Sequence, residues 1–322
     1  MPSSCWNNSA EWLSSSVIDS RRLQYFLAVY DHGSLGRAAA ALDLTQPALS
    51  KTIHQLEREL NVKLFDRTPK GLVPTVYGDT LSLHARAVDS ELRHAAREIA
   101  LLSGAAKGLV RIGTTPSLAG TVLPIAVREL RRERPGIELA VYEGLAQAHA
   151  PALRRGDLDL VVGGWTRGMG ADLVSEVLRE DVVRIVAHRG HPVADGPADL
   201  ATLSRLTWVL PPHTEFWLDH LDRTFVSRGL PPPAPAVISN SAAFIVGMIL
   251  RTDAVSYLPT MLVRRALASG EIVHVEAEDA DVQIDISVTV PARRAPSATV
   301  SAVIEAVRAA CARIEDEAPL TG

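Results

Sequence analysis

Residues 34–51, SLGRAAAALDLTQPALSK, predict two short helices joined by a tight turn. Ser34 stands at the start of the first helix and Thr45 at the start of the second, where a side-chain oxygen can accept a hydrogen bond from a backbone N–H. Pro47 is tolerated in the first turn of the second helix, because a backbone N–H there would have no partner within the helix. This pattern is typical of a helix-turn-helix, whose second helix enters the major groove of DNA.

The polar side chains at the start of the second helix are the candidates for base contact. Gln46 can present a donor and an acceptor to a base edge, and Pro47 can contact a thymine methyl group. Ser50 and Lys51 can reach bases or phosphates. Apolar residues at spacings of four and three form the expected buried face of this helix: Leu49, Ile53, Leu56 and Leu60. A plain helical hairpin with a polar face is the alternative for a stretch this short.

The segments on either side favour the DNA-binding interpretation. Residues 61–75, NVKLFDRTPKGLVPT, contain two short apolar runs around a Pro-Lys-Gly turn, which predicts a β-ribbon wing. Lys70 of the turn is the candidate for approach to the minor groove, and Arg67 for a phosphate contact or an ion pair. Before the motif, a helical apolar spacing predicts one more amphipathic helix with the residues Leu23, Phe26, Leu27 and Tyr30.

At this point the chain closely resembles the LysR-type transcriptional regulators. The matching residues, 21–75, are RRLQYFLAVYDHGSLGRAAAALDLTQPALSKTIHQLERELNVKLFDRTPKGLVPT. Few other families combine TQPALSK with a following QLERELNVKLFDR and a downstream α/β domain. The resemblance implies a winged helix-turn-helix domain at residues 19–75 and double-stranded operator DNA as the partner. The expected DNA-contacting residues are Ser34, Thr45, Gln46, Pro47, Ser50, Lys51, Arg67 and Lys70.

Composition and charge are consistent with a DNA-binding head on a separate sensing domain. The chain has 322 residues, 47% of them hydrophobic, which is enough for two or three domains. The net charge of −4 argues against a general nucleic-acid coat, yet residues 21–75 carry about +3 and the remainder about −7. The two cysteines, Cys5 and Cys311, stand near opposite ends, which argues against a disulfide framework and favours a reduced, cytoplasmic compartment.

Several other classes of segment are absent from the sequence. Residues 1–18 are expected to be a disordered leader, because they have neither a positive start nor an apolar stretch long enough for a signal peptide. No run approaches the roughly 18 apolar residues of a membrane span, so no membrane partner is expected. No metal-ligand cluster is apparent, and neither a metal nor a cofactor is expected.

Residues 76–103 predict one long helix with an apolar seam. The seam residues alternate in steps of four and three: Leu81, Ala85, Val88, Leu92, Ala95, Ile99 and Leu102. This spacing predicts a coiled coil with a second copy, whereas packing on the chain's own effector domain is the alternative. The resemblance favours a dimer through this linker helix and a tetramer through the effector domains. Gly104 and Gly108 are expected to supply a hinge, so that linker and hinge together span residues 76–108.

From residue 109 the pattern changes to alternating strands and helices, which indicates an α/β domain with parallel strands and crossover helices. The expected strands are 109–113, 137–143, 158–163, 182–188, 206–210, 236–240, 254–259, 271–277 and 283–290. The expected helices are 118–134, 146–155, 215–228, 241–251 and 298–315. The arrangement resembles the two-lobed effector domain of the same family, similar in fold to periplasmic solute-binding proteins. Its expected extent is 109–315, with lobe one at about 109–180 and 281–315 and lobe two at about 181–280.

An effector site is expected where the two lobes face each other, beyond the carboxyl ends of the strands. Thr115 and Ser117 precede a helix whose start could hold a carboxylate, although Ser117 would serve equally as a helix cap. Similar proteins often have a hydroxyl residue where Ala146 stands, which directs the expectation to Gln147 or His149. His149 is as readily a surface or helix-face histidine. The remaining candidates are Trp165, His213, Thr214, Phe216, Asn240 and Ser241.

The sequence therefore predicts a sequence-specific transcriptional regulator whose effector is a small, partly apolar organic acid, with RNA polymerase as a further candidate partner. A solute-binding receptor would explain only residues 109–322. An enzyme built on the α/β domain is the third class, but the sequence has no Gly-rich phosphate loop, nucleophile elbow or paired metal motif.

Overall fold

The computed structural model describes residues 18–69, 71–102, 108–164, 170, 172–213, 217–292 and 295–314. The chain divides near residue 105 into two compact units, with the short stretch 154–156 grouped with the first. Residues 1–17 of the expected leader and 103–107 of the expected linker and hinge lie outside the described residues, whereas Gly108, expected in the hinge, is the first residue of a strand.

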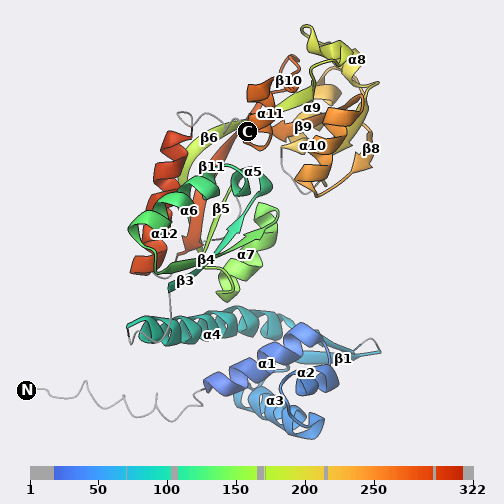
Figure 1. Cartoon of the computed structure of the whole chain (residues 1–322). Helices are drawn as coiled ribbons and strands as arrows, with labels where there is room; N and C mark the ends of the chain where they lie inside the picture. Colours follow the sequence, from blue (N-terminus) through green and yellow to red (C-terminus); the bar gives the residue numbers. More distant parts are fainter. Residues whose placement is uncertain are drawn as a thin grey trace, which may run out of the picture. The chain divides into compact units, whose positions relative to one another are not determined.

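The first unit is a helical domain with a two-stranded wing and a long helix (Figure 1). Its elements are α1 (Ser20–His32), α2 (Leu35–Ala41), α3 (Gln46–Leu60), β1 (Phe65–Thr68), β2 (Gly71–Pro74) and α4 (Val76–Leu102). The apolar faces predicted for α1 and α3 meet in one core around the fully buried Phe26, Leu49 and Leu56. The winged helix-turn-helix is confirmed.

Two glycines hold the wing against the turn between α1 and α2. Gly33 ends α1 in the left-handed conformation, with φ of 58°. Its carbonyl oxygen accepts a hydrogen bond of 2.9 Å from the N–H of Leu72 in β2. Gly71 has φ of +125°, and a Cβ there would lie 2.6 Å from the oxygen of Gly33. Because that contact is with backbone, any other residue at position 71 would push the wing away from the helices.

The second unit is built on a nine-stranded sheet that runs through two lobes, with strand order β4-β3-β5-β11-β6-β9-β7-β8 and β10 beside β6. The strands are β3 (Gly108–Thr114), β4 (Ile137–Glu143), β5 (Leu160–Gly163), β6 (Leu173–His188), β7 (Thr207–Leu210), β8 (Pro235–Ile238), β9 (Ala254–Pro259), β10 (Ile272–His274) and β11 (Val282–Pro291). The long strands β6 and β11 pair antiparallel and pass from one lobe to the other.

Helices cover both faces of the sheet in each lobe. They are α5 (Pro116–Ala119), α6 (Val122–Glu133), α7 (Ala146–Arg155), η1 (Pro192–Ala194), α8 (Leu200–Leu203), α9 (Leu218–Ser227), α10 (Ala242–Arg251), α11 (Thr260–Ser269) and α12 (Ala298–Arg313). In lobe one, Leu160 and Val162 of β5 share a core with α6 and α12, whereas Val161 between them packs with α7. Because both of its faces are covered, β5 is a continuous apolar run rather than an alternating one.

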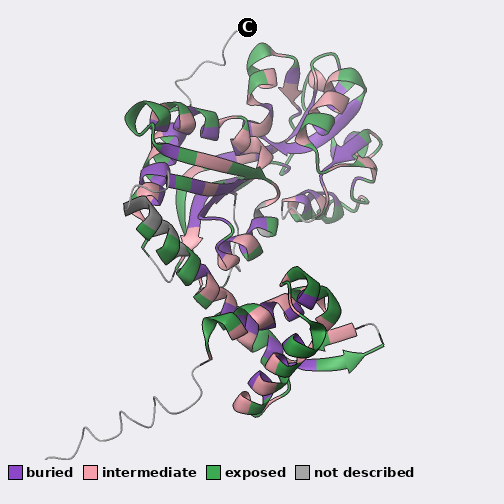
Figure 2. Cartoon of the chain, turned by 60° about the horizontal axis from the view of Figure 1, so that its bottom comes forward, coloured by how far each residue is buried: buried purple, intermediate pink, exposed green. Residues whose placement is uncertain are grey.

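Lobe two has a core that is richer in aromatic residues. Trp208, Phe225 and Tyr257 are fully buried there, and the buried residues follow the strands and the inner helix faces (Figure 2). The indole N–H of Trp208 donates to the carbonyl of Leu203 at 2.8 Å, so the ring is buried without losing its hydrogen bond. Ile284 of β11 belongs to this core, together with Val183 of β6, whereas Ile286, two residues along β11, belongs to the core of lobe one. One strand therefore contributes to the cores of both lobes.

The structure differs from the sequence-based expectation in several elements, and the short η1 and α8 were not predicted at all. The helix expected at 118–134 is two helices, α5 and α6, separated at Gly120 and Thr121. The first half of β6 was not anticipated, because its Val and Glu residues are largely exposed and give no apolar run. The helix α11 was also missed. The strand β9 ends directly in that helix, with Pro259 as the residue before its first turn.

Candidate functional site

The first candidate site is the exposed amino-terminal end of α3. Thr45, Gln46, Pro47 and Lys51 are exposed there and Ser50 is half-buried, while Leu49, Ile53 and Leu56 face the core. Ser34 lies nearby, because a Cβ added to Gly36 would be 3.8 Å from Gln46 Oε1 and 3.9 Å from Ser34 Oγ. The structure thus brings these predicted DNA-contacting residues onto one polar surface.

The first turns of α2 and α3 receive no capping hydrogen bond from the side chains at their N-cap positions. Ser34 and Thr45 occupy the N-cap positions of α2 and α3 in extended conformation, as predicted, but neither side chain makes the capping hydrogen bond. The predicted side-chain caps are therefore corrected. Because the helix ends do not use these two hydroxyl groups, they can serve an outside partner.

The wing lies at the other end of α3. Arg67 is exposed on β1 and stands opposite Leu72 of β2 in the strand register. Lys70, predicted to approach the minor groove, lies outside the described residues.

A buried carboxylate fixes the end of α3 to the start of the wing. Glu57 is 6% exposed and accepts a hydrogen bond of 2.9 Å from the N–H of Leu64. Its other oxygen lies 3.0 Å from Lys63 Nζ and 3.2 Å from His54 Nδ1. Burial alone would raise the pKa of Glu57, but these hydrogen bonds outweigh burial and lower it. The carboxylate is therefore charged at neutral pH and holds the recognition helix in place relative to the wing.

The predicted seam of α4 divides into two parts. Ala85 is buried and Leu81 half-buried in the core of the first unit. Farther along, Val88, Leu92 and Ile99 are 44, 48 and 66% exposed. The coiled-coil prediction is thus corrected for the first part of the seam, which α1 already covers, while the second part presents an apolar surface. The side chain of Leu102 lies outside the described residues.

The second candidate site is an open pocket between the two lobes of the second unit. Its described lining residues are Thr115, Pro116, Ser117, Leu145, Gly164, Pro211, Trp217, Ser239, Asn240, Ala242, Ile245, Leu258, Pro259, Leu262 and Ile284. Most of them follow the carboxyl ends of β3, β4, β5, β7 and β8, where an open α/β sheet places its ligands. The hydroxyl groups of Thr115 and Ser117 lie 3.1 Å apart and share one hydrogen bond.

Some of the predicted effector residues lie at this pocket and others do not. Thr115, Ser117 and Asn240 line it. Ser241, next in sequence to Asn240, instead caps α10, its Oγ accepting from the N–H of Phe244 at 3.3 Å. The side chain of Gln147, and all of Trp165, Thr214 and Phe216, lie outside the described residues.

Two predicted histidines are placed elsewhere. His149 is buried behind β3, where its Nε2 lies 3.2 Å from the carbonyl oxygen of Thr114. Its ring fills the space beside Gly113, since a Cβ there would come within 2.8 Å of it. His213 is exposed, with its Nε2 3.4 Å from Asp222 Oδ2. Neither histidine belongs to the pocket lining, because one packs in lobe one and the other pairs on the surface.

The lining also includes residues that the sequence did not single out. Leu258 and Pro259 come from the end of β9, Ile284 comes from the lobe-crossing β11, and Ser239 directly precedes Asn240. A serine at the end of a strand is a signal that could have identified Ser239. The sequence around Leu258 and Ile284 contains no signal that would distinguish these pocket residues from ordinary core residues.

Asp181 supports the wall of the pocket from β6. The helix α11 follows Pro259, which has no side-chain group to cap it. Asp181 takes that role, accepting hydrogen bonds from the hydroxyl of Thr260 at 2.5 Å and from the N–H of Met261 at 3.2 Å. Burial raises the pKa of Asp181 although these hydrogen bonds favour its charged form. Asp181 also pairs with the pocket residue Ile284 in the strand register, so one side chain connects the lobe-crossing strands to α11.

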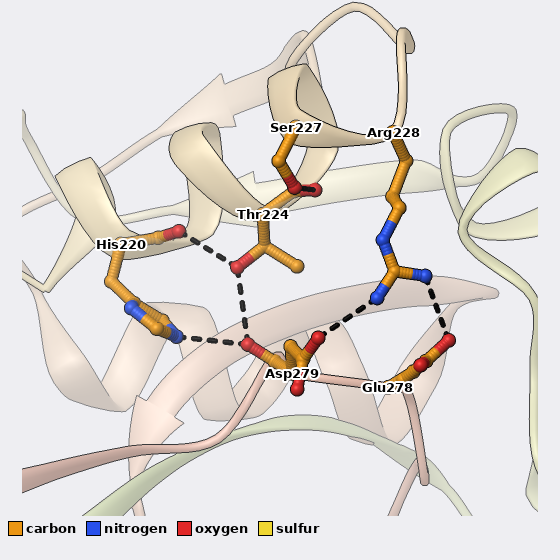
Figure 3. Close-up of polar contacts among 6 residues, drawn as sticks. All are labelled: His220, Thr224, Ser227, Arg228, Glu278 and Asp279. Atoms are coloured by element: carbon orange, nitrogen blue, oxygen red, sulfur yellow. Dashed lines mark hydrogen bonds and ion pairs between the residues drawn. The ribbon is translucent and has the colours of Figure 1, made fainter.

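A polar cluster fastens α9, which begins beside the pocket residue Trp217, to the chain before β11 (Figure 3). Arg228 binds both Glu278 and Asp279, at 2.7 and 2.8 Å. His220 Nε2 donates to the carbonyl of Asp279 at 2.9 Å, and the Thr224 hydroxyl lies 3.1 Å from the same oxygen. These contacts hold Asp279 in a left-handed conformation with φ of 57°. The cluster thus fixes α9 to residues 278–279 within lobe two.

None of the described helices is long and apolar enough to cross a membrane. Over the same residues, no group of three or more His, Cys, Asp or Glu side chains is arranged to hold a metal ion.

Two known family models match the chain, one over each unit. Residues 20–79 match the family described as "Bacterial regulatory helix-turn-helix protein, lysR family", and residues 103–312 match the "LysR substrate binding domain". The chain is 31% identical over 251 residues to the HTH-type transcriptional regulator GbpR of Azospirillum brasilense, covering 77% of this chain and 73% of GbpR.

Solved structures show the same fold. ArgP from Mycobacterium tuberculosis has a TM-score of 0.68 at 20% identity, over 92% of this chain and 98% of ArgP. Full-length CbnR in complex with its target DNA has a TM-score of 0.59 at 19% identity, over 91% of this chain and 100% of CbnR.

The class defined by the fold and the two sites is that of DNA-binding transcriptional regulators with an effector-binding domain. The chain belongs to the LysR family of transcriptional regulators. Its relatives are named as regulators and not as enzymes.

Proposed function

We propose that this protein binds a specific operator through the amino-terminal end of α3 and responds to a small organic effector in the pocket between its lobes. One observation carries the proposal. Exposed polar residues at the start of a helix-turn-helix recognition helix occur in the same chain as a pocket at the carboxyl ends of the sheet strands.

The proposed base contacts come from Gln46, Pro47 and Ser50. The proposed phosphate contacts, which set the register on the duplex, come from the hydroxyls of Ser34 and Thr45 and from Lys51. The wing adds Arg67 and Lys70 as proposed backbone or minor-groove contacts. Base contacts supply discrimination, whereas phosphate contacts supply salt-dependent affinity.

The proposed assembly is a dimer through α4 and a tetramer through the second unit. The exposed Val88, Leu92 and Ile99 make an apolar stripe that a second copy of α4 would cover. At the ends of the sheet, the edge strand β4 exposes Val141 and Tyr142 at 44 and 50%, and β8 exposes Ile238 at 61%. Exposed apolar edge strands favour association between copies.

The proposed effector is a small organic molecule, with a carboxylate as the class predicted from the sequence. Thr115, Ser117 and Asn240 can donate hydrogen bonds to such a group. None of the described lining residues carries a positive charge to balance it. A cytoplasmic location and contact with RNA polymerase are further expectations for a regulator of this kind.

Selection of binding sequences from a random duplex library by the purified full-length protein tests the proposed function. A regulator of this kind should enrich an imperfect palindrome, because a two-fold dimer reads two half-sites about one helical turn or a multiple apart. A protein carrying Val88→Glu and Leu92→Lys should enrich single half-sites or nothing. Recovery of random sequences by the parent protein would contradict the proposal.

A further inference from the structure

The inner wall of the pocket is apolar. Its buried residues come from the ends of β7 and β9, from α10 and from the lobe-crossing β11: Pro211, Ile245, Leu258, Pro259 and Ile284. Trp217, Leu262 and Leu145 are half-buried around them. A molecule that fills this space exchanges water for hydrocarbon over most of its surface, which favours a ring or a branched aliphatic body.

The polar groups on the described lining residues of the pocket are neutral and partly satisfied. Thr115 and Ser117 already share one hydrogen bond of 3.1 Å. The hydroxyl of Ser239 accepts from the N–H of Ser241 at 3.1 Å, which leaves its hydrogen free to donate to a ligand. Asn240 is exposed at the rim, where its amide can donate and accept. Each lobe thus offers one or two weak donors, which suit a hydroxyl or amide group.

An ionised carboxylate fits this lining poorly. Moving a charged carboxylate out of water costs far more than moving a neutral amide, unless a cation or several strong donors replace the water. None of the described lining residues has a charged side chain. The helix after Thr115 cannot substitute, because α5 has only four residues and so contributes few aligned peptide dipoles.

We propose that the pocket selects uncharged ring compounds bearing a hydroxyl or amide group over ionised carboxylates of the same size and shape. This inference rests on the proposed function, since it assigns the effector class of that site. It replaces the carboxylate effector predicted from the sequence.

Isosteric pairs test the proposal on the full-length protein. Benzamide and benzoate, and 2-naphthamide and 2-naphthoate, share their ring and planar head but differ in charge. Saturation-transfer NMR titration at pH 7 should give dissociation constants at least about tenfold lower for each amide, or ~1.4 kcal/mol. Ala242→Trp, which fills the pocket, should abolish binding of both amides.

An engineered cation should invert the preference. Asn240→Arg places a guanidinium at the rim, so the carboxylates should gain affinity relative to the amides. Ala243→Arg adds the same charge to an exposed residue of α10 outside the described lining and should leave the ratio at its parental value.

The outcomes separate this inference from the proposed function. Carboxylates that bind as tightly as the amides, with loss in the Ala242→Trp protein, would overturn the effector class and keep the site. Binding of no ring compound, or binding that survives Ala242→Trp, would overturn the inference as a whole. The duplex selection decides independently whether the chain is a sequence-specific regulator.

Discussion

The DNA-binding unit and the effector-binding unit use their functional residues in opposite ways. At the start of α3 the polar residues lie within one short stretch, 45–51, and are mostly exposed, while apolar residues of the same helix fill the core behind them. The pocket of the second unit is lined by segments from Thr115 to Ile284 and is mostly apolar. One site is therefore a property of a local motif, and the other is a property of the whole fold. Changes in the two units should have separable effects.

The largest expected effect is a loss of stability confined to the second unit. Trp208→Ala removes a fully buried indole that packs edge-on against Phe225 and donates to Leu203. It should lower the free energy of unfolding of that unit by about 3–5 kcal/mol, because the lobe cannot close the cavity. Val226→Ala, at a residue 59% exposed on the same helix as Phe225, is the control and should change little. Urea unfolding followed by hydrogen exchange would resolve the two units. Equal loss of protection in α1 and α3 would show that the units do not unfold separately.

The next effect is on assembly and leaves both units folded. Val88→Glu with Leu92→Lys should separate paired DNA-binding units and weaken operator binding by about 100-fold, through the loss of two-site attachment. Leu83→Lys is the matched control, since Leu83 is 66% exposed on α4 but lies off the predicted seam. Light scattering and operator titration would measure both properties. If the double variant retains the parental mass and affinity, the stripe on α4 is not the dimer contact.

The two units should also differ in their response to acid. Burial lowers the pKa of His191 and of His274 in lobe two, with Asp253 and Asp281 respectively opposing the shift. As the pH falls from about 6.5, these two histidines take up protons in the unfolded chain before they do so in the folded one. Lobe two therefore loses stability over that range. The pKa of Glu57 in the first unit is also lowered, so that unit loses stability only as the pH falls below about 4.5.

Urea unfolding between pH 7 and 5 measures this difference. The second unit should weaken over that range and the first unit should not, and His191→Asn with His274→Gln should flatten the slope of the second. Asp181 and Asp222, whose pKa values burial raises, act in the opposite direction nearer pH 4. An equal slope in both units over pH 7 to 5 would contradict the assignment.

The same contrast explains how much the sequence could predict. The helix-turn-helix, the wing and the α4 helix follow from local spacing, and the structure has them within a residue or two of the expected bounds. The seam on α4 was predicted as one surface, but its first part is covered by α1, a contact that spacing on α4 alone does not show. The strands and helices of the second unit were mostly predicted, because covered strands are continuous apolar runs.

The pocket was predicted only in part, since it depends on contacts between distant residues. Thr115, Ser117 and Asn240 were found because they follow strands. Asp181 was not singled out, because the N–H that it caps belongs to Met261, 80 residues away. His149 was proposed as a ligand residue, but its ring packs inside lobe one, in the space left because Gly113 has no side chain. Such packing is not visible in residue types alone.

The central claim is that the amino-terminal end of α3 reads base sequence, and operator titration of two matched variants tests it most directly. Gln46→Ala removes an exposed amide at that end, and Gln55→Ala removes the same side chain nine residues later, where it bonds Glu59 at 3.0 Å. The Gln46→Ala protein should lose about 1–3 kcal/mol of affinity for the selected operator and keep its affinity for random duplex. The Gln55→Ala protein should match the parent on both. Equal operator affinity for the Gln46→Ala protein and the parent, or equal losses in the two variants, would contradict the account.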